Sequence, residues 1–258
     1  QRMDGKNSTL FFRCVKFSSR PAHADQLHVD LWWRGDNILR DPGTYRYNAS
    51  KPWENALAGT DVHNTLAIGG LDQMQRLGKF LWANWASGML IQTTQKNKDS
   101  ILQVVGEHPG YASHNIKHQR KVIYQSDDIW QVQDDVFSLE GYNPSREYEF
   151  HLHWLLPDAM PKGISSEGWH WQMKQQTLTL QKENREVTIS ARATDTEYPL
   201  QMSIIRAGEC IMGESLAKPH WGWYSPTYGI KTPAIALICT IKGKPPLSVH
   251  TSISLQEA

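Results

Sequence analysis

Short runs of alternating or continuous apolar residues recur along this chain, and Gly, Pro, Asn or Asp interrupts them about every ten residues. Residues 27–33, for example, alternate cleanly before the turn Arg34-Gly35-Asp36-Asn37. A helical period of 3.6 residues is weak throughout. The pattern predicts an all-β fold: a large two-sheet antiparallel β-sandwich with few or no helices, whose sheets cover each other's apolar faces.

We expect the sandwich to include the whole chain. A length of 258 residues is compatible with one large β-domain, so we expect a single domain over 1–258. We expect strands at residues 10–17, 27–33, 38–39, 64–68, 86–92, 101–106, 116–124, 129–137, 148–155, 177–181, 186–191, 202–206, 234–242 and 248–255.

Composition excludes several classes of partner and site. The 27 basic and 26 acidic residues give a net charge of +1, so no global field attracts nucleic acid or an anionic membrane. The three cysteines, Cys14, Cys210 and Cys239, contain no Cys-x-x-Cys pair and predict neither a cysteine zinc site nor a disulfide framework. No apolar run is long enough to span a membrane, and no signal peptide is visible. We expect the chain to be part of a longer protein.

Three polar residues stand at the ends or turns of neighbouring predicted strands. His23 begins a His-Ala-Asp run, Asp41 an Asp-Pro-Gly turn, and His63 a His-Asn-Thr run. Side chains in such places converge at the rim of a sheet, and imidazole nitrogen together with carboxylate oxygen suits zinc or iron. The residues predict a shared divalent metal site, although each could instead be an ordinary hydrogen-bonded residue, as we expect for His28.

A second metal arrangement is compatible with the same residues. His23, Asp25 and His63 could form the two-His, one-carboxylate triad of a non-haem iron oxygenase, a class that also uses β-sandwich scaffolds. Such an enzyme needs an arginine to anchor an oxoacid, and Arg76 would have to serve.

Aromatic residues are abundant, with eleven Trp, and several occur in pairs two residues apart, such as Trp169 and Trp171. Both members of such a pair share one face of a strand, which indicates a thick core or a surface on which sugar rings stack. Core is the preferred interpretation. Trp53, in a turn-like segment, is the Trp that we expect to be exposed. His118 and Arg120 also share a strand face and could line either a groove or the core.

Together these segments resemble the C-terminal β-sandwich of the heparinase II/III-like family of polysaccharide lyases. The resemblance rests on the ordered runs at 23–25, 41–43 and 63–65, followed by Asp72-Gln73, and on the block at 222–229. It spans nearly the whole chain, and the ordered triplet is more specific than any one run.

The resemblance implies that His23, Asp41 and His63 are the protein ligands of a metal ion, with zinc expected and iron or another divalent ion as the alternative. It moves the carboxylate ligand from Asp25 to Asp41. Asp25 and Asn64 then lie behind the ligands, where Asp25 could fix the tautomer of an imidazole.

The implied activity is cleavage of an anionic, uronic-acid-containing polysaccharide or oligosaccharide, such as a glycosaminoglycan, by β-elimination. We expect Arg46, Tyr45 and Trp53 to contact the substrate. The catalytic residues are unknown: the family has an additional histidine where this chain has Pro21, and its other catalytic groups belong to an N-terminal helical toroid that these residues do not include.

The chain alone is therefore expected to be inactive and to need the N-terminal helical domain of the same protein as its partner. A non-catalytic carbohydrate-binding sandwich is the main alternative, and the iron oxygenase is a weaker one. No nucleic acid or membrane partner is expected. A periplasmic or secreted location is our prediction.

Overall fold

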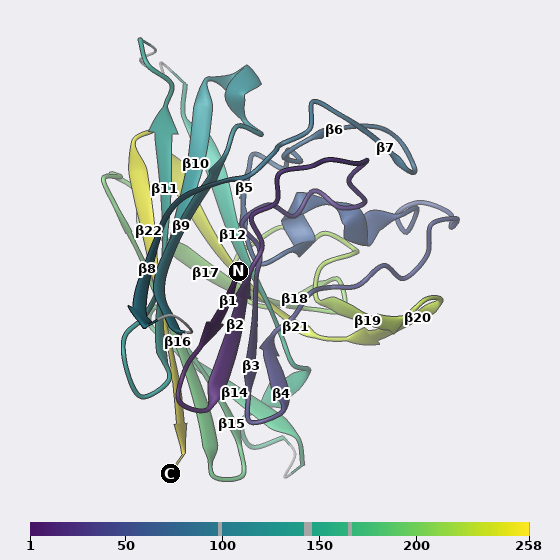
Figure 1. The fold of residues 1–258 in the computed structure, drawn as a ribbon. Coiled ribbons are helices and arrows are strands. Elements are labelled where there is room, and N and C mark those ends of the chain that lie inside the picture. The colour runs from purple at the N-terminus through teal and green to yellow at the C-terminus, as the bar shows by residue number, and fades with distance from the viewer. Residues whose placement is uncertain (98–99, 142–145, 165–166, 258) are drawn as a thin grey trace.

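The computed structural model describes residues 1–97, 100–141, 146–164 and 167–257. Within these residues the chain forms twenty-two β-strands and three short 3-10 helices, with no α-helix. Figure 1 shows the strands in two layers. The predicted all-β class and β-sandwich are confirmed; Ala258, the last residue of the predicted domain, lies outside the described residues. None of the described helices has the length and apolar character needed to cross a membrane.

The larger layer is a nine-stranded sheet in the order β13-β14-β15-β16-β22-β11-β10-β9-β8. Its neighbours pair antiparallel except for β13 and β14, which are parallel. The strands are β8 (Met89–Asn97), β9 (Ser100–His108), β10 (Ile116–Tyr124), β11 (Ile129–Ser138), β13 (Ala159–Pro161), β14 (Trp169–Lys174), β15 (Thr177–Lys182), β16 (Arg185–Thr194) and β22 (Leu247–Glu257).

The opposite layer contains two smaller sheets. One has the order β18-β17-β21-β12-β5 and the other the order β1-β2-β3-β4. Their strands are β1 (Arg2–Asp4), β2 (Ser8–Phe12), β3 (Val29–Trp33), β4 (Asp36–Leu39), β5 (Leu66–Ile68), β12 (Tyr148–Leu156), β17 (Gln201–Arg206), β18 (Glu209–Met212) and β21 (Ile235–Gly243). The N–H of Arg40 donates to the carbonyl of Leu155 at 2.8 Å and joins the end of β4 to β12.

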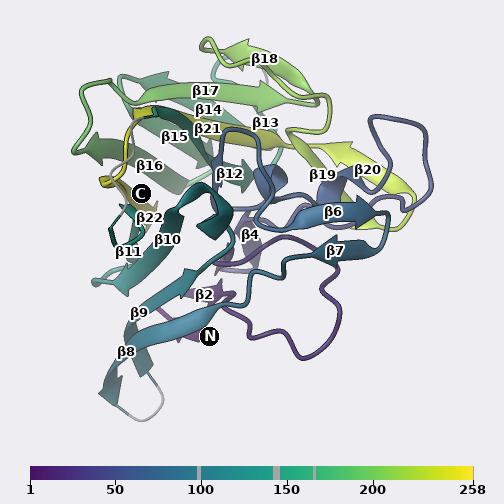
Figure 2. The same ribbon diagram turned by 90° about the horizontal axis from the view of Figure 1, so that it is seen from above.

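Two hairpins and the short helices complete the described chain. Strand β6 (Gln75–Gly78) pairs with β7 (Leu81–Ala83), and β19 (Trp223–Thr227) pairs with β20 (Ile230–Pro233). Figure 2 shows both hairpins on the same side of the sandwich. Helices η1 (Ala56–Ala58) and η2 (Thr60–Val62) precede β5, and η3 (Ala112–His114) lies between β9 and β10.

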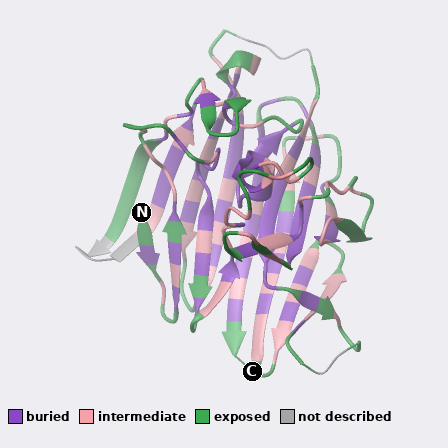
Figure 3. Ribbon diagram, turned by 90° about the vertical axis from the view of Figure 1, so that its right-hand side faces the viewer, coloured by how far each residue is buried: buried purple, intermediate pink, exposed green. Residues whose placement is uncertain are grey.

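The core lies between the layers and follows the two-residue period of the strands. In β10, for example, Ile116, His118, Arg120 and Val122 are buried while the residues between them are partly exposed. Figure 3 shows this alternation along the strands. Trp supplies much of the volume, as predicted; the buried members are Trp33, Trp82, Trp130, Trp154, Trp169, Trp171 and Trp221.

Two predictions about this part of the chain need correction. The strand expected at 10–17 ends at Phe12, because Val15 exchanges hydrogen bonds with the side-chain amide of Gln26 rather than with a strand. Trp53 is half-buried, because its ring packs edge-on against Trp223 at a centroid distance of 5.6 Å. The short strands β1, β6, β7, β13, β14 and β18 to β20 were not predicted.

Candidate metal centre

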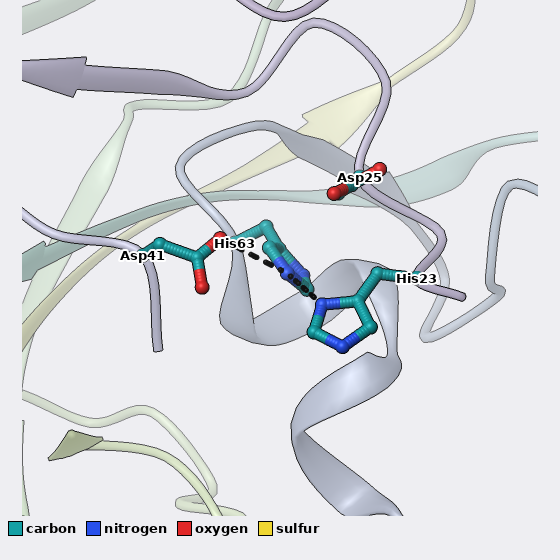
Figure 4. Close-up of side chains that lie close together, drawn as sticks. All are labelled: His23, Asp25, Asp41 and His63. Carbon is teal, nitrogen blue, oxygen red and sulfur yellow. Dashed lines mark hydrogen bonds and ion pairs between the residues drawn. The ribbon is translucent and has the colours of Figure 1, made fainter. Parts of the chain in front are cut away.

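Three irregular segments meet where β3, β4 and β5 begin or end. His23 lies in the connection between β2 and β3, Asp41 follows β4, and His63 follows η2. One ligand atom from each of these residues, and one from Asp25, lie within 4.8 Å of one another. Figure 4 shows the His63 ring between Asp41 and His23, with Asp25 approaching from another side. This partly buried His and Asp group could hold a metal ion.

The orientation of His63 suits a ligand. Its Nδ1 lies 2.6 Å from the carbonyl of Gly59 and must donate there, so Nε2 carries the lone pair. That Nε2 is 3.2 Å from Nδ1 of His23 and 3.6 Å from Oδ2 of Asp41. Two ligands about 2.1 Å from one tetrahedral ion would be separated by about 3.4 Å. The spacing and the donor set therefore fit a single ion such as zinc.

Asp41 divides its two oxygens between the turn and the cluster. Oδ1 accepts the N–H of Gly43 at 2.8 Å, and Oδ2 faces His63. Gly43 has a φ of +74°, and a Cβ at this position would collide with the carbonyl of Ser225. The Asp-Pro-Gly run thus forms the turn that both aims the carboxylate and allows β19 to pack against it.

The protonation states of the cluster also suit metal binding, which requires neutral imidazoles and an ionised carboxylate. Burial, assisted by the nearby His63, lowers the pKa of His23 to about 4. Desolvation by the surrounding chain would raise the pKa of Asp41, but His63, His28 and the Gly43 N–H outweigh it, so this pKa lies below its ordinary value.

His28, which we expected to be an ordinary structural residue, belongs to the surroundings of the cluster. Its Nδ1 accepts the backbone N–H of Asn64 at 2.9 Å, so its Nε2 carries the hydrogen and lies 3.9 Å from Oδ2 of Asp41. Its position five residues after His23 in the same segment was the available signal. At this distance Nε2 of His28 makes no hydrogen bond to Asp41, and since it carries the hydrogen it is not a further ligand.

Asp25 belongs to the four-residue cluster and Asn64 follows His63 in the chain, but neither orients His63, whose Nδ1 donates to the carbonyl of Gly59. Asp25 forms an ion pair with Nε of Arg13 at 2.7 Å. The buried side chain of Asn64 donates to the carbonyls of Val29 and Arg40 and accepts the N–H of Leu155. Asn64 therefore ties together the strands from which the site residues emerge.

A buried arginine, Arg120, binds the backbone of the segments that carry His28 and His63. Nη1 of Arg120 donates to the carbonyls of Leu27 and Asn64 at 2.7 and 2.5 Å, next to His28 and His63 in the chain. Its Nε and Nη2 bind both oxygens of Asp134 at 2.7 and 3.0 Å. Both side chains are 0% exposed. Arg120 thus belongs to the core, which resolves the alternative left open by the sequence.

The network continues along the inner face of the large sheet. Oδ1 of Asp134 accepts a hydrogen bond from Nε2 of His118 at 2.7 Å, and Nδ1 of His118 faces Nε2 of His108 at 3.2 Å. The N–H of Gly110 donates to Nδ1 of His108, which sets one consistent direction of donation from Gly110 to Asp134. The buried charges are therefore paired and hydrogen-bonded, as burial requires.

The heparinase II/III-like C-terminal family matches residues 1–254. The chain belongs to this family. A heparin-sulfate lyase of Bacteroides stercoris is 25% identical over 136 residues, which cover 50% of this chain and 17% of that protein.

Solved structures show the same fold. A heparinase III gene product superposes with a TM-score of 0.70 at 16% identity, over 97% of this chain and 33% of its own. The heparan sulfate lyase HepC of Pedobacter heparinus gives 0.69 at 13% identity, over 98% and 34%. The chain thus spans about a third of the length of these solved relatives.

The residues that we expected to contact substrate lie beyond Asp41 on the same loop of this heparinase II/III-like domain. Arg46 is exposed, and its guanidinium lies 5.3 Å from the centre of the Tyr45 ring. The ring of Tyr45 in turn meets that of Trp53 at 5.4 Å. Whether any of the three touches a substrate stays a prediction.

The buried histidines predict a domain that loses stability in acid. Burial lowers the pKa of both His28 and His153 to about 3, well below 6.5 in an unfolded chain. Below pH 6.5 the unfolded chain takes up protons that the folded chain cannot, so stability is complete above that pH and falls on acidification. Each histidine should lower the free energy of unfolding by about 2 kcal/mol between pH 7 and pH 5.

Urea unfolding of the metal-free domain at both pH values measures this loss. Replacing the buried His153 by Met removes one titrating group, so the variant should lose about 2 kcal/mol less than the wild type over the same range. Equal losses in the two proteins would contradict the assignment of acid sensitivity to His153.

Proposed function

We propose that this domain is the sandwich module of a polysaccharide lyase that cleaves uronic-acid-containing polymers by β-elimination. Family membership supports the proposal, and the relatives named above are heparin and heparan sulfate lyases. The observation that carries it is the convergence of His23, Asp41 and His63 from three separate segments at ligand spacing. We propose that the ion is zinc. We also propose that the acidic polymer lies in a groove along the edge of the sandwich where the ion holds the three segments together.

In β-elimination a base removes the proton from the carbon beside the carboxylate. The bond to the glycosidic oxygen then breaks, a double bond forms in the sugar, and the leaving oxygen receives a proton. Negative charge grows on the carboxylate during the first step, so a preplaced cation lowers the barrier. Arg46 is the residue of this domain that we assign to that role, because it is exposed and close to Asp41 along the chain.

We assign the metal ion the role of holding the three loops of the site together. Bound zinc would supply a fixed positive charge at the rim. The chain's own residues hold the loops: Gly59 fixes the His63 tautomer, and the Gly43 N–H holds the other oxygen of Asp41. With Pro21 at the position of the family's additional histidine, we assign the base and acid to residues beyond this domain. The chain alone is then inactive.

The test uses the full-length protein and a panel of uronic-acid polymers, including heparan sulfate and alginate. Products of elimination contain a conjugated double bond, so ultraviolet absorbance should rise with the full-length protein and not with the isolated domain. Arg46→Ala should lower kcat/KM about a hundredfold. Arg34→Ala, which changes an exposed arginine in the distant β3–β4 turn, should leave it unchanged. Silence of the full-length protein on the whole panel would count against a lyase.

A non-catalytic carbohydrate-binding module is the second candidate, and Pro21 favours it because a proline cannot exchange a proton. The same experiment separates the two, since this candidate predicts affinity for the polymer without any rise in absorbance. The iron oxygenase is less well supported, because Asp25 is paired with Arg13 and the guanidinium of Arg76 stacks on Trp82 at 4.7 Å. A periplasmic or secreted location remains a proposal that cell fractionation would test.

A further inference from the structure

Three aromatic rings from separate segments meet beyond the candidate metal centre. Tyr47 follows Asp41 in the loop before η1, Phe80 lies in the turn between β6 and β7, and Tyr228 lies in the turn between β19 and β20. The centroid of the Tyr47 ring is 5.0 Å from that of Phe80 and 5.3 Å from that of Tyr228. We call these three residues the aromatic surface. Figures 1 and 2 show the two hairpins on the same side of the sandwich, and Figure 1 shows the β6–β7 hairpin above the β19–β20 hairpin.

The rings of the aromatic surface are open to solvent. Tyr47 is 38% exposed, Phe80 45% and Tyr228 56%. The rings of Trp53 and Trp223 differ, because Nζ of Lys231 lies 4.0 and 3.0 Å from their centres and occupies the space between them. A cluster of exposed aromatic side chains is unfavourable in water and indicates a binding surface. Tyr and Phe rings also offer the flat apolar face on which a sugar ring can stack.

The charges around the aromatic surface favour an acidic ligand. The three segments that form it, residues 45–54, 77–81 and 226–232, carry the cations Arg46, Lys51, Lys79 and Lys231 and one carboxylate, Glu54. Glu54 is paired with Lys79 at 3.4 Å, which leaves a positive excess. Because the whole chain has a net charge of only +1, this excess is local.

Hydrogen bonds connect the aromatic surface to the turn that carries Asp41. The N–H of Gly229, next to Tyr228, donates to the carbonyl of Tyr45 at 2.7 Å. The N–H of Tyr45 donates to Oγ of Ser225 at 2.9 Å. The two segments therefore hold a defined position relative to each other.

We infer that the aromatic surface is a distal binding subsite for sugar rings of the same acidic polysaccharide. This inference rests on the proposed function. Arg46 and the residues around the candidate metal centre bind the sugars nearest the cleaved bond. The three residues of the aromatic surface stack on sugars farther along the polymer. Its contribution therefore depends on ligand length: short oligosaccharides do not reach the aromatic surface, whereas long ones do.

Dissociation constants for size-defined heparan sulfate and alginate oligosaccharides test the inference on the 258-residue chain loaded with zinc. Tyr228→Ala and Phe80→Ala should each weaken binding of octasaccharides about two- to tenfold and leave disaccharide binding and zinc content unchanged. Phe11→Ala on β2 is the matched control, since Phe11 is as exposed as Phe80, at 45%, and lies in a different sheet.

The outcomes separate the two proposals. If octasaccharides bind the wild type and both variants equally, or if Phe11→Ala weakens binding as much, the subsite is wrong and the proposed function stands. If the wild-type chain binds none of the oligosaccharides, the subsite is wrong, and the absorbance assay with the full-length protein still decides the proposed function. Weaker disaccharide binding by Tyr228→Ala and Phe80→Ala would also overturn the distal assignment.

Discussion

Replacement of Arg120 by Met should lower the free energy of unfolding of the domain by about 3 to 5 kcal/mol, which is the usual cost of removing one partner from a buried ion pair. The variant leaves Asp134 charged and 0% exposed, with His118 as its remaining partner. It also leaves the carbonyls of Leu27 and Asn64 without the donor that joins them. Urea unfolding at neutral pH measures the loss.

Arg206→Met is the matched control. Arg206 also binds both oxygens of an aspartate, Asp158, at 2.7 and 2.8 Å, but the two side chains are 29% and 41% exposed. A pair open to water should contribute less than about 1 kcal/mol. Equal losses in the two variants would show that the burial of Arg120 has no special energetic effect. Because Leu27 and Asn64 adjoin His28 and His63, we also expect Arg120→Met to weaken metal binding.

Replacement of His63 by Ala should abolish stoichiometric metal binding. His63 lies between the other two proposed ligands, so its removal leaves His23 and Asp41 without the central donor. In the wild type, zinc at a hundred times its dissociation constant should stabilise the domain by about 2.7 kcal/mol, and this gain should vanish in the variant. Elemental analysis of the dialysed protein and thermal unfolding with and without zinc provide the two measurements.

Four further variants complete the metal test. His23→Ala and Asp41→Ala should lose the metal as well, whereas His250→Ala, on β22 of the large sheet, should retain it. Retention of the metal by Asp41→Ala together with its loss in Asp25→Ala would overturn the proposed ligand set and favour the iron triad.

Local sequence predicted most of the long strands well, although β8 spans Met89–Asn97 instead of 86–92. The strand expected at 116–124 coincides with β10, whose first eight residues alternate between a buried and a partly exposed side. The hairpins β6–β7 and β19–β20 were missed because they are short, lie outside the main sheets and contain interruptions such as Pro226. Their positions depend on contacts with the loop that follows Asp41.

In the candidate site, too, some features could be predicted from the sequence and others depended on tertiary contacts. The residue types and turns around His23, Asp41 and His63 were readable because metal chemistry restricts which side chains can serve. The role of His28 as an acceptor was not readable, since it depends on the backbone N–H of Asn64 from another segment. Likewise, Trp53 had turn-like neighbours, yet Lys231 and Trp223, far away in the chain, enclose its ring.

By itself, the sequence determined the all-β class, the positions of the long strands and the group of residues that could bind a metal. These features depend on patterns two residues apart and on the chemistry of individual side chains. Only the tertiary structure decided that Arg120 supports the site from the core and that Tyr47, Phe80 and Tyr228 form one surface. Both results arise from residues far apart in the chain, whose approach is set by packing of the layers and by hydrogen bonds between loops.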